Sequence, residues 1–348
     1  MAEGIGSLGE LGIGSEATPG TPVRAQEFLD FTDETITIDS PPIESMSLRA
    51  RRSRERAVPN RLNPNGSFTT ELQSENMMRL WRSLLGNSAQ SIGASPYGTT
   101  WKVLNTAASV TPSTVSLILG SGGTYWQLFY GACVGSVELR FALDQIVQAI
   151  WTVMARETAI DNGTLALRDA GAGYDANEPM VFTRADIYLN GSLSSDVRAG
   201  TIRINNGLIP KNVIKRQRAM PAHLQQSFTV EGDLEMYFST DAELRRFLGD
   251  SGSSYPYKHV ETAVRVGDLL INVAAASGST QDCLIFDADR VIYRAVGAPV
   301  RGLDAIVQTV GFFCQYDATM ASPFALTLTN GQTSTNSQLA GTSVTSLP

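Results

Sequence analysis

The sequence predicts a mainly β protein in which each half carries one flanking helix. Many short segments alternate apolar and polar residues, the period-two pattern of half-buried strands. Asn-Gly, Ser-Gly and Ala-Gly pairs separate these segments, as hairpin turns require. A strand followed directly by a helix also occurs twice, at Gly66 and again 166 positions later at Gly232. These three observations favour two related β units in one chain.

The later strand–helix unit is GDLEMYFSTDAELRRFLG, residues 232–249. Apolar residues alternate with polar ones over residues 233–238, which predicts a half-buried strand. Thr240 and, three positions later, Glu243 form the sequence pattern of a capping box, and an apolar stripe follows over residues 244–248. Gly249 is suited to end the helix.

The earlier unit, GSFTTELQSENMMRLWRSLLG at residues 66–86, repeats this order. A strand pattern is followed by Ser74 in the capping position, Trp81 stands where Phe247 stands, and Gly86 ends the helix. Only Gly66/Gly232 and Arg79/Arg245 are identical over the aligned residues. The pattern of strand, cap and helix therefore predicts a duplication that sequence identity alone hardly reveals.

Further strand-like segments follow each unit. In the first half they are TVSLIL, TYWQLFYGACV, GSVELRFAL and AIWTVMAR. In the second half ADIYLNGSL, TIRINNGL and NVIKRQR precede the helix, and LLINVAAA, CLIFDA, RVIYRAV and AIVQTVGFFCQY come after it. The uncharged stretch 103–137 contains Pro112 and five glycines, which favours buried hairpins over a membrane helix.

Charge and composition suggest how the chain is divided. Residues 1–40 hold eight acidic residues against one basic residue, a net charge of −7, which predicts an extended acidic arm over residues 1–45. A first β module is expected over residues 46–160, a Gly- and Asp-rich linker over 161–180, and a second module over 181–330. The uncharged, Ser/Thr-rich residues 331–348 predict a flexible tail.

The sequence holds little equipment for catalysis, and we expect neither an enzyme nor a cofactor. Three scattered cysteines and two histidines give no metal-ligand pattern and fit a reducing compartment. The G-x-G-x-x-G at residues 4–9 lacks the preceding strand of a dinucleotide site. The GDSG at residues 249–252 resembles a protease nucleophile motif, but neither His223 nor His259 has a matching context.

A basic run over residues 49–61 leaves two interpretations open. Clustered arginines could neutralise the phosphates of a nucleic acid, or they could form a salt-bridge surface between subunits that complements the acidic arm. No aromatic residue interleaves the run. The interface candidates are Arg49, Arg51, Arg52, Arg54 and Arg56, the cluster Lys215, Arg216 and Arg218 at the same offset in the second half, and the acidic residues Asp30, Asp33 and Glu34.

Several motifs in order resemble the tail tube (major tail) proteins of long-tailed bacteriophages. They are ELGIGSEATPGTPV, NGSFTTEL, ENMMRLWRSLLG, IYLNGSLSSDVRAGTIRINNGL and LEMYFSTDAELRRFL, and the likeness covers roughly residues 9 to 330. The likeness is closest to the larger members, in which the tube module occurs twice. It implies two tandem β-sandwich or barrel-like modules, each with a flanking helix, whose inner strands join a ring-shaped β-barrel.

The same resemblance implies a structural role without catalysis. Rings of three chains would stack into a tube that conducts DNA from the capsid to the host, in a virion tail assembled in the host cytoplasm. It implies as partners other copies of the chain and the tape measure, tail terminator and distal tail proteins, with transient passage of DNA and no membrane. The alternatives are another ring-forming tail component, such as a distal tail or terminator protein, and a DNA-binding protein that uses Arg49–Arg61.

A tube that conducts DNA needs a bore that repels phosphate, and a net acidic surface achieves this at long range. Glu231, Asp233 and Glu235 lie on one face of the strand expected over residues 230–238, opposite its apolar residues. We therefore expect these three carboxylates to line the bore. A solvated outer face or a contact between subunits would explain them equally well.

Overall fold

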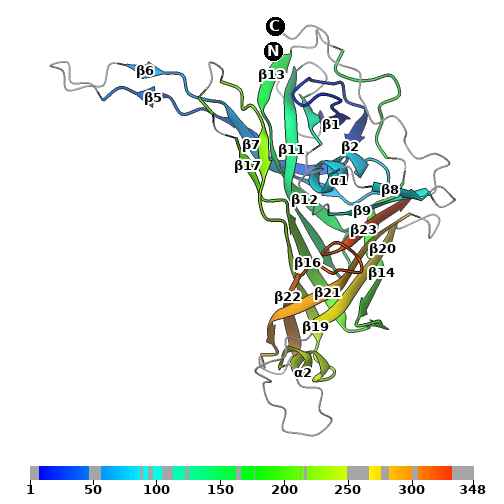
Figure 1. Cartoon of the computed structure of the whole chain (residues 1–348). Coiled ribbons are helices and arrows are strands. Elements are labelled where there is room, and N and C mark those ends of the chain that lie inside the picture. The colour runs from blue at the N-terminus through cyan, green and yellow to red at the C-terminus, as the bar shows by residue number, and fades with distance from the viewer. Residues whose placement is uncertain are drawn as a thin grey trace.

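The fold consists of antiparallel sheets built around one shared core, seen in a computed structural model (Figure 1). The structure describes residues 8–46, 56–86, 89–92, 97–103, 113–121, 125–161, 166–175, 177–211, 213–214, 218–248, 266–275, 282–299 and 305–330. The expected tail over residues 331–348 lies outside this part of the chain. The expectation of a mainly β fold with two helices is confirmed.

One sheet, which we call the inner sheet, runs through both halves of the chain. Its strands are joined by antiparallel ladders from one edge to the other. In spatial order they are β3 (Phe31–Glu34) and β4 (Thr37–Asp39) at one edge, then β7 (Asn63–Glu71), β12 (Gln148–Met154), β11 (Tyr125–Ala142), β16 (Val197–Asn205), β19 (Thr229–Tyr237), β22 (Val307–Cys314) and β21 (Cys283–Gly297).

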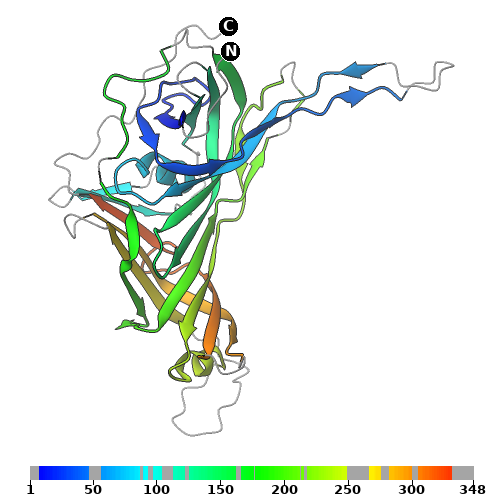
Figure 2. The same cartoon turned by 180° about the vertical axis from the view of Figure 1, so that it is seen from behind.

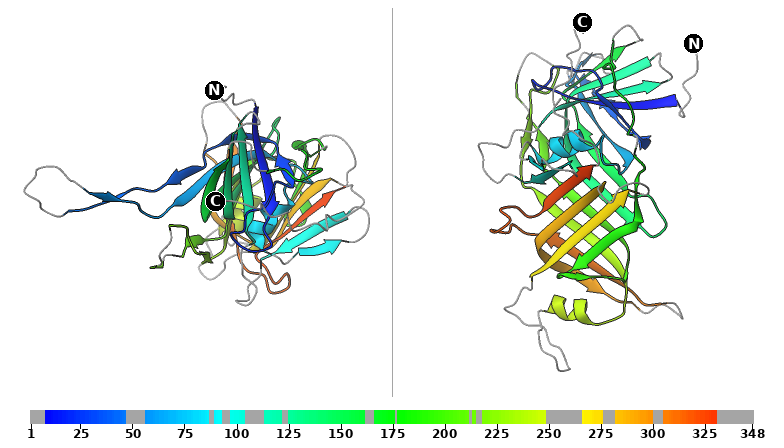
Figure 3. Two further views of the ribbon diagram at one scale, coloured as in Figure 1. Left: turned by 90° about the horizontal axis from the view of Figure 1, so that it is seen from above. Right: turned by 90° about the vertical axis from the view of Figure 1, so that its right-hand side faces the viewer.

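Two outer layers continue from the inner sheet. The first runs β2 (Glu27–Leu29), β1 (Gly9–Ser15), β10 (Val115–Ser121), β11 and β13 (Glu157–Asp161). The second runs β15 (Ser192–Leu193), β14 (Met180–Leu189), β20 (Val266–Ala275), β21, β23 (Ala325–Asn330), β9 (Tyr97–Lys102) and β8 (Ala89–Ile92). In the right-hand view of Figure 3 the yellow-to-red strands of the second layer lie across the green strands of the inner sheet.

The long strands β11 and β21 each belong to the inner sheet and to one of the outer layers. The sequence patterns predicted two segments that meet near Gly135 and two that meet near Asp289. Each pair of segments instead forms one continuous strand. Gly131 has a φ of +61°, and the ladder to β12 shifts register between Val134 and Ser136. A bulge of this kind bends a strand instead of ending it, so β11 passes from the outer layer into the inner sheet.

The core joins both halves of the chain. One cluster of buried residues extends from Leu11 and Ile13 on β1 to Leu326 and Leu328 on β23. This placement corrects the expected acidic arm over residues 1–45, because β1 to β4 pair with strands of the sheets and Leu11 and Ile13 have no exposed surface. Of the acidic residues of this region, Asp33, Glu34 and Asp39 are exposed, whereas Glu27 at the start of β2 is buried.

The two helices follow corresponding strands but differ in burial. α1 (Met78–Leu85) contacts β1, β9 and β11 and is largely buried, whereas α2 (Ala242–Leu248) lies on β21 and has no buried residue. Ser74 does not cap α1, which begins after Met77 without a side-chain cap, and α2 begins one residue later than a Thr240 cap requires. Gly86 ends α1 as predicted, with a φ of +88°.

A thin two-stranded hairpin projects from the body of the molecule (Figures 1 and 2). It is formed by β5 (Ile43–Glu44) and β6 (Ala57–Val58), whose side chains are exposed. A second hairpin, β17 (Leu208–Pro210) with β18 (His223–Gln225), lies beside the first half and buries Leu208 and His223.

Candidate assembly surfaces

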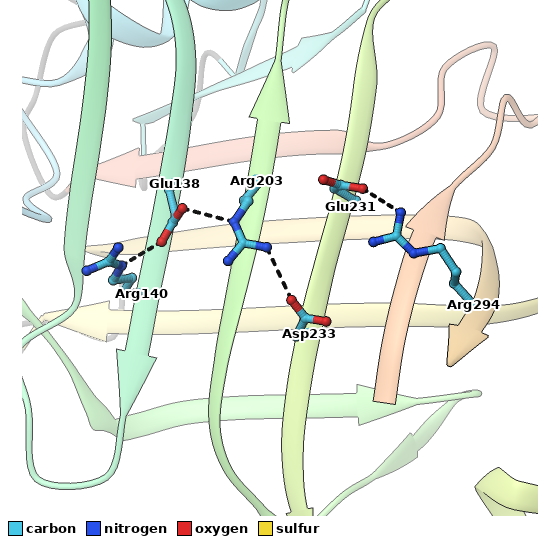
Figure 4. A network of polar contacts seen from close by, with 6 residues as sticks. All are labelled: Glu138, Arg140, Arg203, Glu231, Asp233 and Arg294. Atoms are coloured by element: carbon cyan, nitrogen blue, oxygen red, sulfur yellow. Dashed lines mark hydrogen bonds and ion pairs between the residues drawn. The ribbon is translucent and has the colours of Figure 1, made fainter. Parts of the chain in front are cut away.

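One face of the inner sheet is exposed and carries a network of charged side chains (Figure 4). Arg140 Nε donates to Glu138 Oε1 at 2.6 Å, and Arg203 Nε donates to Glu138 Oε2 at 2.9 Å. Arg203 Nη1 reaches Asp233 Oδ2 at 3.2 Å on the next strand. Partial burial alone would raise the pKa of Glu138, but the hydrogen bonds from the two arginines outweigh it and lower that pKa.

The three carboxylates predicted to line a bore all lie on this face. Besides the Asp233–Arg203 pair, Glu231 lies 2.8 Å from Arg294 and Glu235 lies 3.9 Å from Arg198. Sequence reasoning singled out the acidic residues and missed the arginines beside them. The alternation in VELRFA and TIRIN places Arg140 and Arg203 on the same side as Glu138, so that signal was present.

The exposed face is acidic in sum even with these arginines. Alternation along the strands and the ion pairs described above place two sets of charged groups on this face: the carboxylates of Asp33, Asp39, Glu71, Glu138, Glu231, Asp233 and Glu235, and the guanidinium groups of Arg140, Arg198, Arg203 and Arg294. Four positive and seven negative charges give this face a net charge of −3 within the described strands.

Both edges of the inner sheet are open in the described part of the chain. β3 and β4 pair only with β7, and residues 293–297 of β21 pair only with β22. Ile38 on β4 is 38% exposed, and Ala295 and Gly297 on β21 are exposed. Open sheet edges present unpaired backbone donors and acceptors and are ready to pair with another strand.

The ladders of the two halves coincide when residue numbers are shifted by 166. β3–β4 pairs with β7 as β16 pairs with β19: Phe31↔Thr70 corresponds to Val197↔Met236, and Asp39↔Asn63 corresponds to Asn205↔Thr229. Even the bulge falls at the same place, after Phe31 in one ladder and after Val197 in the other. Neither correspondence needs an insertion or deletion.

The identical glycines of the repeat share one physical cause. A Cβ on Gly66 would lie 2.6 Å from the carbonyl oxygen of Thr35, and a Cβ on Gly232 would lie 2.4 Å from that of Thr201. Thr35 and Thr201 are themselves 166 residues apart. At both places the neighbouring backbone approaches so closely that only glycine fits.

The two hairpins correspond in the same way. Ile43↔Val58 in the projecting hairpin matches Ile209↔Leu224 in the second hairpin, again at an offset of 166. The second hairpin is bonded to the first half, because Leu62 N donates to Arg218 O at 3.1 Å and Arg156 Nε donates to Met220 O at 2.8 Å. The projecting hairpin instead extends away from the body of the molecule (Figures 1 and 2).

Strands after the helices correspond at an offset of 159. β12 lies on β7 as β22 lies on β19, with Gln148↔Glu71 matching Val307↔Tyr237. β11 then pairs with β12 as β21 pairs with β22, so that Cys133↔Met154 matches Ile292↔Phe313. The bulge at Gly135 has its counterpart at Arg294.

Most of the basic interface candidates lie outside the described residues, namely Arg49, Arg51, Arg52, Arg54, Lys215 and Arg216. Arg56 is exposed near β6. Arg218 donates to Asn60 O at 2.9 Å and to Ser40 Oγ at 3.0 Å, so it ties the second hairpin to the base of the first.

The acidic interface candidates do not gather at one place. Asp30 Oδ2 accepts a hydrogen bond from Gln73 Nε2 at 2.7 Å, and Glu34 Oε2 accepts one from the nearby Ile36 N at 2.9 Å. Asp33 is exposed on the open edge. Their expected pairing with the arginine run stays a prediction.

Groups with catalytic potential are few in the described part of the chain. No cluster of three metal-ligating side chains is found there. Burial raises the pKa of Cys133 and of Cys314 to about 12, and Cys283 is buried as well. The motifs at residues 4–9 and 249–252 lie wholly or mostly outside the described residues. Among the described helices, none has the length and apolar character needed to cross a membrane.

Comparison with known families gives one result that covers most of the chain. A family model described as phage tail tube protein matches residues 6–312. The match includes every strand of the inner sheet except the last two residues of β22, and it spans both open edges. Among curated proteins, none matches the chain.

Proposed function

Because the chain belongs to the phage tail tube protein family, we propose that three copies close into a ring and that stacked rings form the tube through which DNA passes. As a tail tube protein it is a structural subunit of the virion tail. The observation that carries the proposal is the inner sheet, which has a core on one face only and is open at both edges.

The paired ladders support two tandem modules within each ring. Three pairs of matching ladders, two of which carry a bulge at the corresponding position, are hard to obtain unless one module has been duplicated. We assign the first module to begin at β1 instead of residue 46, with residues 161–180 as the linker and residues 181–330 as the second module. The matched hairpins support the same division.

Three chains suffice to close such a wall. Each chain offers eight strand positions, counting β3 and β4 as one, so three chains give 24. With strands about 4.8 Å apart and tilted by about 40°, a barrel of that size has a backbone diameter of about 48 Å. A bore of this width accommodates a DNA duplex after side chains are added.

The exposed face of the inner sheet is then the surface of the bore. Its net charge of −3 per chain adds to −9 per ring of three, which repels phosphate at long range without binding it. The arginines within it are each held by carboxylates, as Arg203 is by Glu138 and Asp233. Glu231, Asp233 and Glu235 remain our lumen candidates on this basis.

Partners and site of assembly follow from the same proposal. The tube would meet the tape measure, tail terminator and distal tail proteins at its inside and ends, and it would assemble in the host cytoplasm. The basic residues around Arg56 and Arg218 and the acidic edge at Asp33 remain candidates for contacts between subunits.

Electron microscopy and native mass spectrometry of the purified full chain test the proposal together. Hollow tubes whose rings contain three chains are the expected result. Six chains per ring would place one half outside the wall and overturn the two-module ring. Single rings that never stack would favour a distal tail or terminator protein, and salt-dependent binding of free DNA without tubes would favour the DNA-binding alternative.

A further inference from the structure

The junction between the two halves shows how one sheet edge of this chain accepts another. β11 and β16 pair antiparallel, with Val137 directly opposite Ile204 and Glu138 opposite Arg203. Val137 and Ile204 are 1% and 0% exposed. Asn206 N also donates to Gly135 O at 2.8 Å, just beyond the end of β16. The two halves are therefore held by a continuous backbone ladder with buried apolar pairs.

The two open edges carry the counterparts of these same strands. β21 corresponds to β11 at an offset of 159, and β3–β4 corresponds to β16 at an offset of 166. Val296 thus takes the place of Val137, and Ile38 takes that of Ile204. Val296 is half-buried and Ile38 is 38% exposed, although both point to the core side of the sheet. The apolar pair Val137 and Ile204 is buried at the internal junction, whereas the corresponding pair at the open edges, Val296 and Ile38, lacks cover.

We propose that β21 of one copy pairs antiparallel with β3–β4 of a second copy in the register of the β11–β16 junction. The shifts fix each partner: Ala295 lies opposite Asp39, Val296 opposite Ile38, and Gly297 opposite Thr37. Ser40 N then donates to Arg294 O, as Asn206 N does to Gly135 O. This inference rests on the proposed ring and specifies the contact between its chains.

The projecting hairpin is placed to join the same contact. Within the chain, the second hairpin follows β16 and lies on the half of the chain that β16 pairs with through β11. The first hairpin leaves the edge strand β4 and extends away from its own body (Figures 1 and 2). A copy docked on β3–β4 through its β21 would stand beneath it. Pro42 and Ala57, exposed here, correspond to the buried Leu208 and His223.

The strand pairing is unlike the internal junction in one respect. The charged pair Glu138–Arg203 has Gly297 and Thr37 as its counterparts, so no ion pair bridges the two copies at this point. The contact between chains then depends on backbone hydrogen bonds, on the apolar pair and on the hairpin. A pairing slipped by two residues would place Val296 opposite Ile36 and leave Ile38 uncovered.

Cysteine pairs test the register directly. Adjacent cross-strand pairs alternate between closer and wider spacing, so both Ile38→Cys/Val296→Cys and Thr37→Cys/Gly297→Cys are made. Gly297 has open space for a side chain, and the native cysteines are buried. Oxidation of assembled protein should shift at least one variant from monomer to trimer mobility on a non-reducing gel. The pair Thr35→Cys/Gly297→Cys, slipped by two residues, is the matched control and should stay monomeric.

The outcomes separate this inference from the proposed function. Tubes of unmodified protein together with cross-links only in the slipped control, or in none of the variants, overturn the register and leave the tube standing. Absence of tubes from the unmodified protein overturns both. If the variants do not assemble, hydrogen–deuterium exchange of unmodified protein decides: residues 37–39 and 295–297 must gain protection on assembly, and unchanged exchange at either edge refutes the pairing.

Discussion

The indole of Trp81 on α1 meets that of Trp151 on β12 edge to face, with ring centroids 4.8 Å apart and an interplanar angle of 72°. Both side chains are fully buried, and Trp151 Nε1 donates to Thr70 Oγ1 at 2.9 Å on β7. The contact fixes α1 against the core side of the inner sheet. Its counterpart on α2, Phe247, is 39% exposed.

Substitution of Trp81 and Phe247 therefore has unequal effects at corresponding positions. Trp81→Ala should lower the free energy of unfolding by about 3–5 kcal/mol, because it removes a buried aromatic ring and leaves a cavity. Phe247→Ala should cost less than about 1 kcal/mol in the free subunit. Chemical denaturation of both variants measures the difference. Equal losses would mean that α2 is buried in solution as α1 is.

The glycine pair gives a test of the repeat itself. Gly66→Ala and Gly232→Ala should each lower the free energy of unfolding by about 1–3 kcal/mol, because the new methyl group meets the carbonyl oxygen of Thr35 or Thr201. Gly297→Ala, on the open edge with no atom within reach, is the control and should leave the stability nearly unchanged. Thermal unfolding measures all three, and a harmless Gly232→Ala would contradict the close approach.

The buried ion pair between Arg79 and Glu27 joins α1 to β2. Burial raises the pKa of Glu27, although Arg79 opposes that shift. Arg79→Met should cost about 3–5 kcal/mol by leaving a buried carboxylate uncompensated, and the double variant with Glu27→Leu should recover part of that loss. A double-mutant cycle in urea measures the coupling. Additive losses would show that the pair does not act as a unit.

His223 should make the stability depend on pH. Burial, with added repulsion from Arg156, lowers the pKa of His223 to about 4 from its usual 6.5. Below pH 6.5 the unfolded chain gains a proton that the folded chain does not, so the folded state loses stability as the pH falls. The loss from this group should be about 2 kcal/mol between pH 7 and pH 5.

His223→Gln isolates this contribution, because every other titrating group stays in place. The difference in unfolding free energy between the two proteins, measured at both pH values, should change by that amount. An equal slope in both proteins would show that His223 is accessible and titrates normally.

Charge reversal on the exposed face tests its place in the bore. Changing Glu231, Asp233 and Glu235 to lysine alters the face from −3 to +3 per chain and leaves the backbone ladders intact. Tubes should still assemble, and phage carrying the variant should eject DNA more slowly because the bore attracts phosphate. The control reverses Glu178, Asp186 and Asp289, exposed residues away from this face, and should eject DNA normally. Normal ejection by the first variant would refute a lumenal position.

The sequence by itself determined the elements that depend on local pattern. The strand over 229–237, the helix that follows it and the related unit around Gly66 were all predictable, because alternation and turn residues act within a few positions. Three of the five motifs that resemble tail tube proteins lie in these same segments. Their order along the chain is a property of the sequence alone.

Only the tertiary structure decided what depends on neighbours distant in the chain. The acidic residues 1–45 suggested an arm, yet Leu11 and Ile13 are buried because β10 and α1 offer them a core. Trp81 is buried and Phe247 is exposed although the two helices follow the same sequence pattern. The reason is that β1 and β9 cover α1, whereas α2 lies at the end of the sheet. Pairing register and open edges arise between strands, where no single segment carries the information.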